Sequence, residues 1–139
     1  MPSSIHRFLR ALSRHGVVLI MLVAVTVQAA WAQGPGQAPG GMDRTLDAML
    51  QALQAGSLPD FIGPGDAAFQ SGMNQQMLEQ VRSKLAPRLQ QGYTSTFLGT
   101  LHQEGYTIYL WKLAFKDGLD DRLITMATKE GKVAGFFLR

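Results

Sequence analysis

The chain ends in four short runs of strand-forming residues, and an acidic residue followed by glycine separates each run from the next. The runs are Thr94–Gln103, Tyr106–Lys116, Arg122–Thr128 and Lys132–Arg139. They are rich in aromatic, β-branched and leucine side chains, which pack well on a pleated surface. The separating pairs, which place glycine where a tight hairpin needs positive φ, are Glu104-Gly105, Asp117-Gly118 and Glu130-Gly131. This pattern predicts one four-stranded antiparallel meander.

Two-residue turns at these pairs predict a register in which both faces of the sheet are apolar. Trp111 lies opposite Leu98 and Ile124, Ile124 lies opposite Phe137, and Tyr109 and Met126 share their face, beside Gly135. The other face collects seven apolar residues: Phe97, Leu101, Ile108, Leu110, Leu123, Phe136 and Leu138. Helices can cover one face. The other must meet a second subunit, line a pocket or remain an exposed patch, and large exposed patches are uncommon in soluble monomers.

The residues before the sheet predict helices. Residues 43–55 carry one apolar stripe at helical spacing, formed by Leu46, Met49, Leu50 and Leu53. Asp43 is suited to cap the start of this helix and Gly56 to end it. A short helical turn is expected at 57–61. A second long helix is expected at 74–90, with Met77, Val81 and Leu85 on one face and a kink or an end at Pro87. Helices gathered on one face of an antiparallel sheet make an α+β domain.

Residues 1–32 have the pattern of a secretory signal peptide. Arg7, Arg10 and Arg14 precede an uncharged apolar run at 16–27, and Ala30-Trp31-Ala32 fits a cleavage site. Export to the periplasm or the extracellular space is therefore expected, without stable membrane insertion after cleavage; an uncleaved N-terminal anchor is the alternative. Residues 33–41 are Gly/Pro-rich and predict a flexible linker, which leaves 42–139 as a single α+β domain.

Charge and cysteine content exclude several kinds of function. Three of the 13 basic residues lie in the signal, so the remainder carries ten basic and ten acidic residues and has no basic footprint for nucleic acid. The chain has no cysteine, which excludes disulfides and thiolate sites. One histidine outside the signal, His102, gives no metal cluster, and the carboxylates fall mostly in turns or at helix starts. We expect no metal, no cofactor and no identifiable catalytic residue.

The layout resembles the nuclear transport factor two-like superfamily, which includes ketosteroid isomerases and polyketide cyclases, and in particular its small exported bacterial members of unknown function. The resemblance rests on Asp117-Gly118, on Asp121-Arg122-Leu123, on residues 130–136 (EGKVAGF) and on the Leu53…Gly56…Phe61 region. It implies a cone-shaped α+β fold whose known members include enzymes, small-ligand binders and dimeric adaptors. The cystatin inhibitors share a helix-on-sheet shape, but their Q-x-V-x-G hairpin is matched here only by Val133 and Gly135, in the last hairpin rather than the first.

Two candidate sites follow. Tyr109, Trp111 and His102 share a face and could line a pocket for a small apolar ligand, or, for the two aromatic residues, simply pack in the core. Lys112 lies mid-strand with Leu110 and Leu123, where a dry core would not tolerate an unpaired ammonium, so its side chain either extends to the sheet edge or marks a partly wet face. The dimer-face candidates are Leu110, Lys112, Leu123, Phe136 and Leu138.

These sites support three hypotheses. The first is a non-enzymatic module that forms a homodimer, with room for a small apolar ligand. The second is an isomerase- or cyclase-type enzyme with its pocket near Tyr109, Trp111 and His102. The third is an accessory module that binds another envelope protein.

Overall fold

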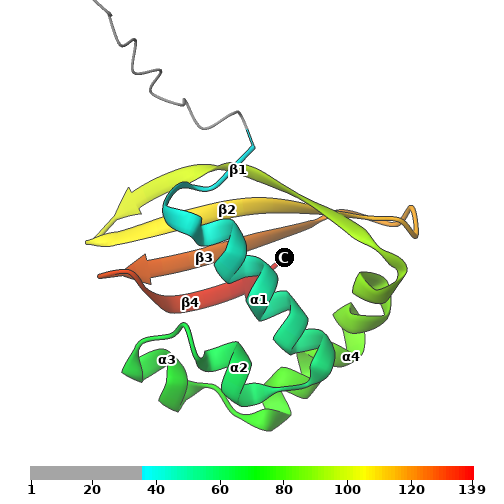
Figure 1. Cartoon of the computed structure of the whole chain (residues 1–139), viewed down its shortest axis with the longest axis horizontal. Helices are drawn as coiled ribbons and strands as arrows, with labels where there is room; N and C mark the ends of the chain where they lie inside the picture. Colours follow the sequence, from blue (N-terminus) through cyan, green and yellow to red (C-terminus); the bar gives the residue numbers. More distant parts are fainter. Residues whose placement is uncertain (1–35) are drawn as a thin grey trace, which may run out of the picture. The chain divides into compact units, whose positions relative to one another are not determined.

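The computed structural model describes residues 36–139, so the expected signal peptide at 1–32 and the first part of the expected linker lie outside the described residues. After a short 3-10 turn, η1 (Pro39–Gly41), come four helices and four strands. The helices are α1 (Met42–Ala55), α2 (Leu58–Ile62), α3 (Ala67–Gly72) and α4 (Gln75–Gln91). The strands are β1 (Tyr93–Gln103), β2 (Tyr106–Phe115), β3 (Arg122–Lys129) and β4 (Lys132–Leu138). The sheet order β1-β2-β3-β4 is the predicted meander, and the class is α+β (Figure 1).

α1 lies across the sheet in Figure 1 and provides the centre of the core. Its predicted stripe of Leu46, Met49, Leu50 and Leu53 is fully buried, because a 3.6-residue period places these side chains on one face. Gly56, with a φ of 69°, ends the helix in the left-handed conformation that favours glycine. Helix α1 and its glycine stop are confirmed. Ala38, within the segment expected as linker, is also buried.

The other helices differ in part from the prediction. α3 was not expected; it begins after Asp66, whose side chain accepts a hydrogen bond from the Phe69 N–H at 2.8 Å. α4 begins after Asn74, which caps it in the same way, and it continues through Pro87 to Gln91. Its buried residues are Leu78, Leu85, Ala86 and Leu89. Met77 and Val81, expected on the buried face, are 42% and 36% exposed.

The hairpins between β1 and β2 and between β3 and β4 are tight two-residue turns, as predicted. Glu104 and Gly105 have φ values of 52° and 83°, and Glu130 and Gly131 have 51° and 77°. Positive φ at both positions is the type I′ geometry that matches strand twist. The Asp117-Gly118 pair does not form a tight hairpin. The β2–β3 ladder stops at Leu113 and Arg122, and a wider loop follows, in which the Asp117 side chain accepts from the Leu119 N–H.

Two β-bulges shift the predicted register. Leu98 is an extra residue in β1, so Phe97 rather than Leu98 pairs with Trp111. Ala134 is an extra residue in β4, so Ile124 pairs with Leu138 rather than Phe137, and Met126 pairs with Phe136 rather than Gly135. The β2–β3 register, with Trp111 opposite Ile124, is confirmed. Because side chains alternate between faces, each bulge transfers the residues beyond it to the other face.

The bulges therefore decide which residues the helices cover. Phe97, Phe136 and Leu138 lie on the same face as Trp111, Ile124 and Met126. The last three belong to the core cluster with the helices, and the first three are partly buried and pack against it. Phe136 meets Phe61 of α2 edge-to-face at 5.4 Å between ring centroids. The predicted placement of Phe97, Phe136 and Leu138 beside Leu110 and Leu123 was wrong, because a strict two-residue alternation leaves no room for the extra residues.

Candidate functional site

The face of the sheet opposite the helices is apolar and uncovered within residues 36–139. We call it the open face and define it by Leu98, Leu101, Ile108, Leu110, Leu123 and Phe137. Leu98, Leu101 and Phe137 are 56%, 54% and 54% exposed, and the other three are half-buried by their neighbours in the sheet. None of the six belongs to the core cluster. Of the five predicted dimer-face residues, Leu110, Lys112 and Leu123 lie on this face.

Lys112 pairs with Leu123 across β2 and β3 and is exposed. Its Nζ lies 3.9 Å from an Asp121 carboxylate oxygen, and both side chains are about half exposed, at 47% and 51%. An exposed pair at this distance contributes little to stability. The exposure of both side chains shows that the open face is accessible to water near the β2–β3 loop.

A cavity of about 350 Å³ lies on the open face near the tight hairpins. Its apolar lining comes from Tyr106, Ile108, Ala127, Gly135 and Phe137. Gly135 is buried because the Phe137 ring lies over it, and a Cβ at this position would be only 2.8 Å from Phe137 Cε2. The cavity floor is thus shaped by a glycine and the aromatic ring two residues further along the same strand.

On the helix-covered face, Tyr109, Trp111 and Phe97 form an aromatic cluster. Tyr109 and Trp111 stack with ring centroids 5.9 Å apart and an interplanar angle of 23°. Phe97 lies 5.6 Å from Trp111 and 6.4 Å from Tyr109. Trp111 is fully buried. The cluster is a packed part of the core, and none of its three residues lines the cavity on the open face.

Asp43 provides a carboxylate to this cluster. Its Oδ1 accepts a hydrogen bond from the Trp111 Nε1–H at 2.7 Å, and its Oδ2 accepts from the Ala38 N–H at 2.8 Å. The sequence had suggested Asp43 as the cap of α1, but α1 begins at Met42 and Asp43 makes no capping bond. A buried Trp needs an acceptor for its N–H, and that requirement was the signal that sequence reasoning missed.

The next turn of α1 carries a second acid, Asp47. Partial burial raises its pKa, and the nearby Asp43 charge adds to the effect. Burial likewise raises the pKa of Tyr93, with a further contribution from Asp47. These shifts reflect shielding from water at the junction of α1 and β1.

His102 is not part of the aromatic cluster. It pairs with Thr107 on β2, two residues before Tyr109, and its side chain is exposed. The nearest polar contact joins His102 Nδ1 and Thr107 Oγ1 at 3.4 Å. The structure therefore brings Tyr109 and Trp111 together and leaves His102 apart from them.

Arg88 and Asp117 form the shortest ion pair among the described residues. Arg88 Nε and Nη2 donate to the two Asp117 oxygens at 2.6 and 3.2 Å, and Nη2 also donates to the Asp120 carbonyl at 2.9 Å. The hydrogen bonds from Arg88 lower the pKa of Asp117, and those to Asp117 raise the pKa of Arg88. The Arg88 guanidinium also lies over the Phe115 ring, 3.9 Å from its centroid. This arrangement joins α4 to the β2–β3 loop and fixes the guanidinium.

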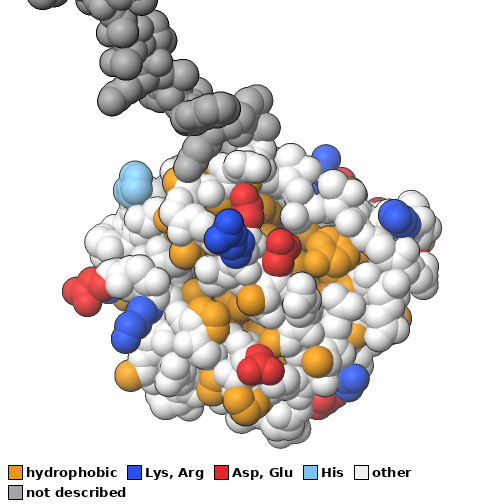
Figure 2. All heavy atoms as spheres, viewed as in Figure 1, with side chains coloured by type: hydrophobic (Ala, Val, Ile, Leu, Met, Phe, Trp, Pro, Cys, Tyr) orange, Lys and Arg blue, Asp and Glu red, His pale blue; other side chains and the backbone are white. Residues whose placement is uncertain are grey.

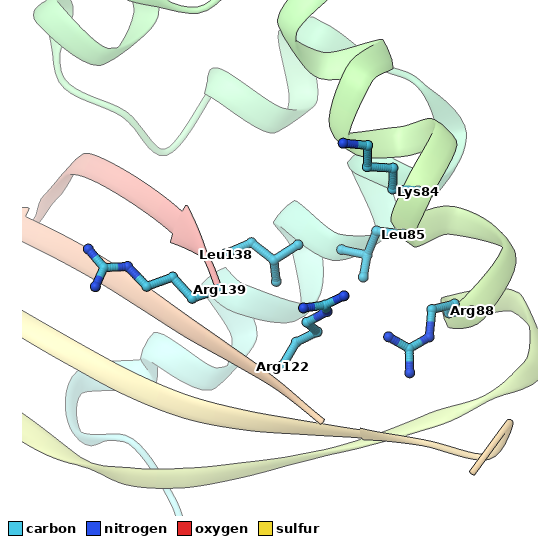
Figure 3. A pocket seen from close by; sticks show the side chains of 6 residues that line it. All are labelled: Lys84, Leu85, Arg88, Arg122, Leu138 and Arg139. Carbon is cyan, nitrogen blue, oxygen red and sulfur yellow. The ribbon is translucent and has the colours of Figure 1, made fainter. Parts of the chain in front are cut away.

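A cleft separates α4 from the sheet next to this ion pair (Figure 3). A cavity of about 270 Å³ there is lined by Lys84, Leu85, Arg88, Arg122, Leu138 and Arg139. An adjoining cavity of about 430 Å³ shares Lys84, Leu138 and Arg139 and adds Val81 and Phe136. On the helix-bearing side shown in Figure 2, charged side chains of both signs are dispersed. Among residues 36–139, no three His, Cys, Asp or Glu side chains are grouped closely enough to hold a metal ion.

Comparisons with known proteins assign no family. No protein-family model matches the chain, and no curated protein matches it. The chain is similar to the crystal structure of an uncharacterised cystatin-fold protein from Novosphingobium aromaticivorans, with a TM-score of 0.35 and 12% identity over 69% of this chain and 95% of that one. Within residues 36–139, no helix combines the length and apolar character needed to cross a membrane. The chain is an α+β domain with helices on one face of its antiparallel sheet and an apolar open face on the other.

Proposed function

We propose that this domain is a non-enzymatic module that forms a homodimer through the open face of its sheet. The observation that carries the proposal is the exposure of Leu98, Leu101 and Phe137, each more than half accessible, on the one face that no helix in residues 36–139 covers. Burying such side chains stabilises association by roughly 25 cal/mol for each Å² of apolar surface removed from water. A two-fold axis through the face would cover both copies at once.

Features of the open face support pairing with an identical face. The sheet centre is apolar at Ile108 and Leu110, and the charged pair of Lys112 and Asp121 lies beside Leu123, toward the β2–β3 loop. An apolar centre with a polar, water-accessible margin is the usual arrangement of a protein interface. The cavity beside Phe137 would receive a side chain of the second copy.

The cavity also favours a second candidate, the binding of a small apolar ligand. Its volume of about 350 Å³ falls within the range of small-molecule sites, and it offers the apolar side chains of Ile108, Ala127 and Phe137 beside the polar Gln103 and Glu104. This ligand site replaces the one expected at Tyr109, Trp111 and His102, where Trp111 is fully buried and His102 is exposed. An isomerase or cyclase activity would require an opening of the aromatic cluster toward Asp43.

We also propose that the protein is exported and that it is related to the nuclear transport factor two-like superfamily. The signal pattern of residues 1–32 supports export to the periplasm or beyond, and a helix-on-meander layout supports kinship with the nuclear transport factor two-like superfamily. Export would be tested by fractionating cells that express the full chain: a product shortened at Ala32 outside the cytoplasm is expected, and a full-length product in the cytoplasm would contradict it.

The dimer is tested by sedimentation velocity over a concentration series, using the chain from Gln33 onward, because all core residues lie within 38–138. We expect a dimer at micromolar concentration. Leu101→Glu should weaken it at least about 10-fold by placing a charge in the interface. Leu119→Glu is the matched control, because Leu119 is 67% exposed in the β2–β3 loop and off the open face.

Two outcomes would overturn the dimer. One is a wild-type monomer at roughly 100 µM, where even a weak specific pair would form. The other is equal weakening by Leu101→Glu and Leu119→Glu. Recovery of a different envelope protein with the monomeric chain, lost in Leu101→Glu, would assign the open face to that partner instead.

A further inference from the structure

Positively charged side chains gather in the cleft between α4 and β4, although the numbers of basic and acidic residues in the domain are equal. Residues 36–139 contain ten basic and ten acidic residues, yet four of the ten basic residues line the smaller cavity of this cleft and no acidic residue does. Lys84 and Arg122 have no acidic partner within 4.0 Å among the described residues. Two cations beside one cavity are therefore uncompensated by direct ion pairs.

Arg88 contributes a positioned donor to the same cavity. Asp117 and the Asp120 carbonyl occupy its Nε–H and Nη2–H groups, and Phe115 supports its plane. The Nη1 group makes no hydrogen bond within residues 36–139. A guanidinium fixed by its neighbours loses little conformational freedom when it binds, and its planar donors suit phosphate and carboxylate oxygens. In Figure 3 the guanidinium groups of Arg88 and Arg122 both point toward the cavity, whereas the Arg139 side chain extends away.

The carboxylates near Arg88 leave this donor available. Asp117, Asp120 and Asp121 all raise the pKa of Arg88, and Asp117 does so through direct hydrogen bonds. Asp121 also lies near Lys112. None of these three side chains lines the cavity. The Asp117 carboxylate holds the guanidinium through two hydrogen bonds, and the cavity lining itself includes no aspartate or glutamate.

Apolar surface continues from this cationic end. Leu85 and Leu138 form the floor of the smaller cavity, and the adjoining one adds Val81 and Phe136. Val81 lies on a helix that packs on the core, but its side chain lines the adjoining cavity and is 36% exposed. The guanidinium groups of Arg88 and Arg122 thus lie at one end of the cleft, and apolar surface continues toward Val81 and Phe136, where Gln80, Lys84 and Arg139 also line it.

We propose that the α4–β4 cleft binds an amphiphilic anion. Arg88 Nη1 and Arg122 hold a phosphate or carboxylate head group, and an alkyl chain lies over Leu85 and Leu138 toward Val81 and Phe136. The charged end provides orientation through charge-assisted hydrogen bonds. The apolar end distinguishes an amphiphile from an inorganic anion. Arg88 and Arg122 do not belong to the open face, whereas Phe137 of the open face also lines the adjoining cavity.

The test is calorimetric titration of the chain from Gln33 onward with octyl phosphate, octanoate, inorganic phosphate and octanol, below the micelle concentration of each amphiphile. Saturable binding of octyl phosphate or octanoate is expected, at least about 10-fold tighter than inorganic phosphate because several CH₂ groups leave water. Octanol, which lacks the charge, should bind at least about 10-fold more weakly than octyl phosphate.

Variants separate the two ends of the cleft. Arg122→Gln should weaken octyl phosphate about 10-fold, whereas Arg44→Gln, which removes an exposed charge on α1, should not. Val81→Ser should weaken octyl phosphate and leave inorganic phosphate unchanged. Circular dichroism on each variant verifies that it is folded.

Three results would overturn the proposal: no saturable binding of either amphiphile, equal binding of octyl and inorganic phosphate, or equal loss in Arg122→Gln and Arg44→Gln. Binding of an acidic peptide of alternating Glu and Val without binding of octyl phosphate would also overturn it, in favour of a protein segment. Each result can be obtained whether the chain is a monomer or a dimer, so failure here leaves the open-face dimer unaffected.

Discussion

Asp43 links the start of the domain to the centre of its core. One carboxylate oxygen accepts from Trp111, 68 residues away in sequence, and the other accepts from Ala38. Because Trp111 is fully buried, its N–H has no access to water if this acceptor is removed. A buried donor without a partner costs about 1–3 kcal/mol.

Asp43→Ala should therefore lower the free energy of unfolding by about 1–3 kcal/mol, measured by urea titration of Trp fluorescence. Asp47→Ala is the control at an equivalent position one turn later. Asp47→Ala should not destabilise the domain at pH 7, because partial burial and Asp43 already raise the pKa of Asp47 and disfavour its charge. Equal losses in the two variants would show that the Trp111 bond is not the cause.

At the scale of elements, the hairpins contain glutamates in an unfavourable backbone conformation. Glu104 and Glu130 have φ values of 52° and 51°. The left-handed region costs a typical residue about 1–2 kcal/mol, while Asn adopts it more readily. Glu130→Asn should raise the free energy of unfolding by about 0.5–1 kcal/mol. Glu130→Gln removes the same charge without this preference, and its stability should stay at the wild-type value in the same urea titration.

The ion pair between α4 and the β2–β3 loop gives a pH dependence. The pKa of Asp117 is lowered in the folded state by its hydrogen bonds to Arg88. The folded protein then binds fewer protons than the unfolded chain as pH falls below about 4, so the stabilisation is present above that pH and lost below it. Asp117→Asn should be less stable than wild type at pH 7, and the difference should shrink toward pH 3.

Urea titrations at several pH values measure this effect. Asp120→Asn provides the control, because Asp120 contacts Arg88 through its backbone carbonyl and not through its carboxylate. A constant difference between wild type and Asp117→Asn from pH 7 to pH 3 would contradict the assignment.

Strand ranges and two of the three tight turns could be predicted because they depend on local composition, but the turn at Asp117-Gly118 and the sides of the sheet could not. The two bulges, at Leu98 and Ala134, add one residue without changing the apolar character of the strand. Each bulge directly precedes a glycine inside a strand, Gly99 or Gly135, and that position is a known mark of a bulge. The prediction that Leu110, Lys112 and Leu123 share a face is therefore confirmed, because they lie on the bulge-free strands β2 and β3, whereas Phe136 and Leu138 lie on the opposite face. The α4–β4 cleft depends on tertiary contacts that local sequence does not specify.

For the whole molecule, the packed domain begins earlier than residue 42. Ala38 is 6% exposed, belongs to the core cluster and donates its N–H to Asp43. A chain starting at Met42 loses this packing and this hydrogen bond. Its free energy of unfolding should be about 1 kcal/mol lower than that of a chain starting at Gln33. The urea midpoint should therefore fall. Equal midpoints for the two chains would show that the domain is complete from Met42.

The Ala134 bulge also bears on how relatives of this chain could be recognised. If a relative lacks the extra residue, an ungapped alignment of the last strand would match inward positions of one protein with outward positions of the other. Identity and hydrophobic similarity would then look lower than the shared ancestry warrants. An alignment that places a one-residue gap between Val133 and Gly135 would match inward positions with inward positions in such a relative.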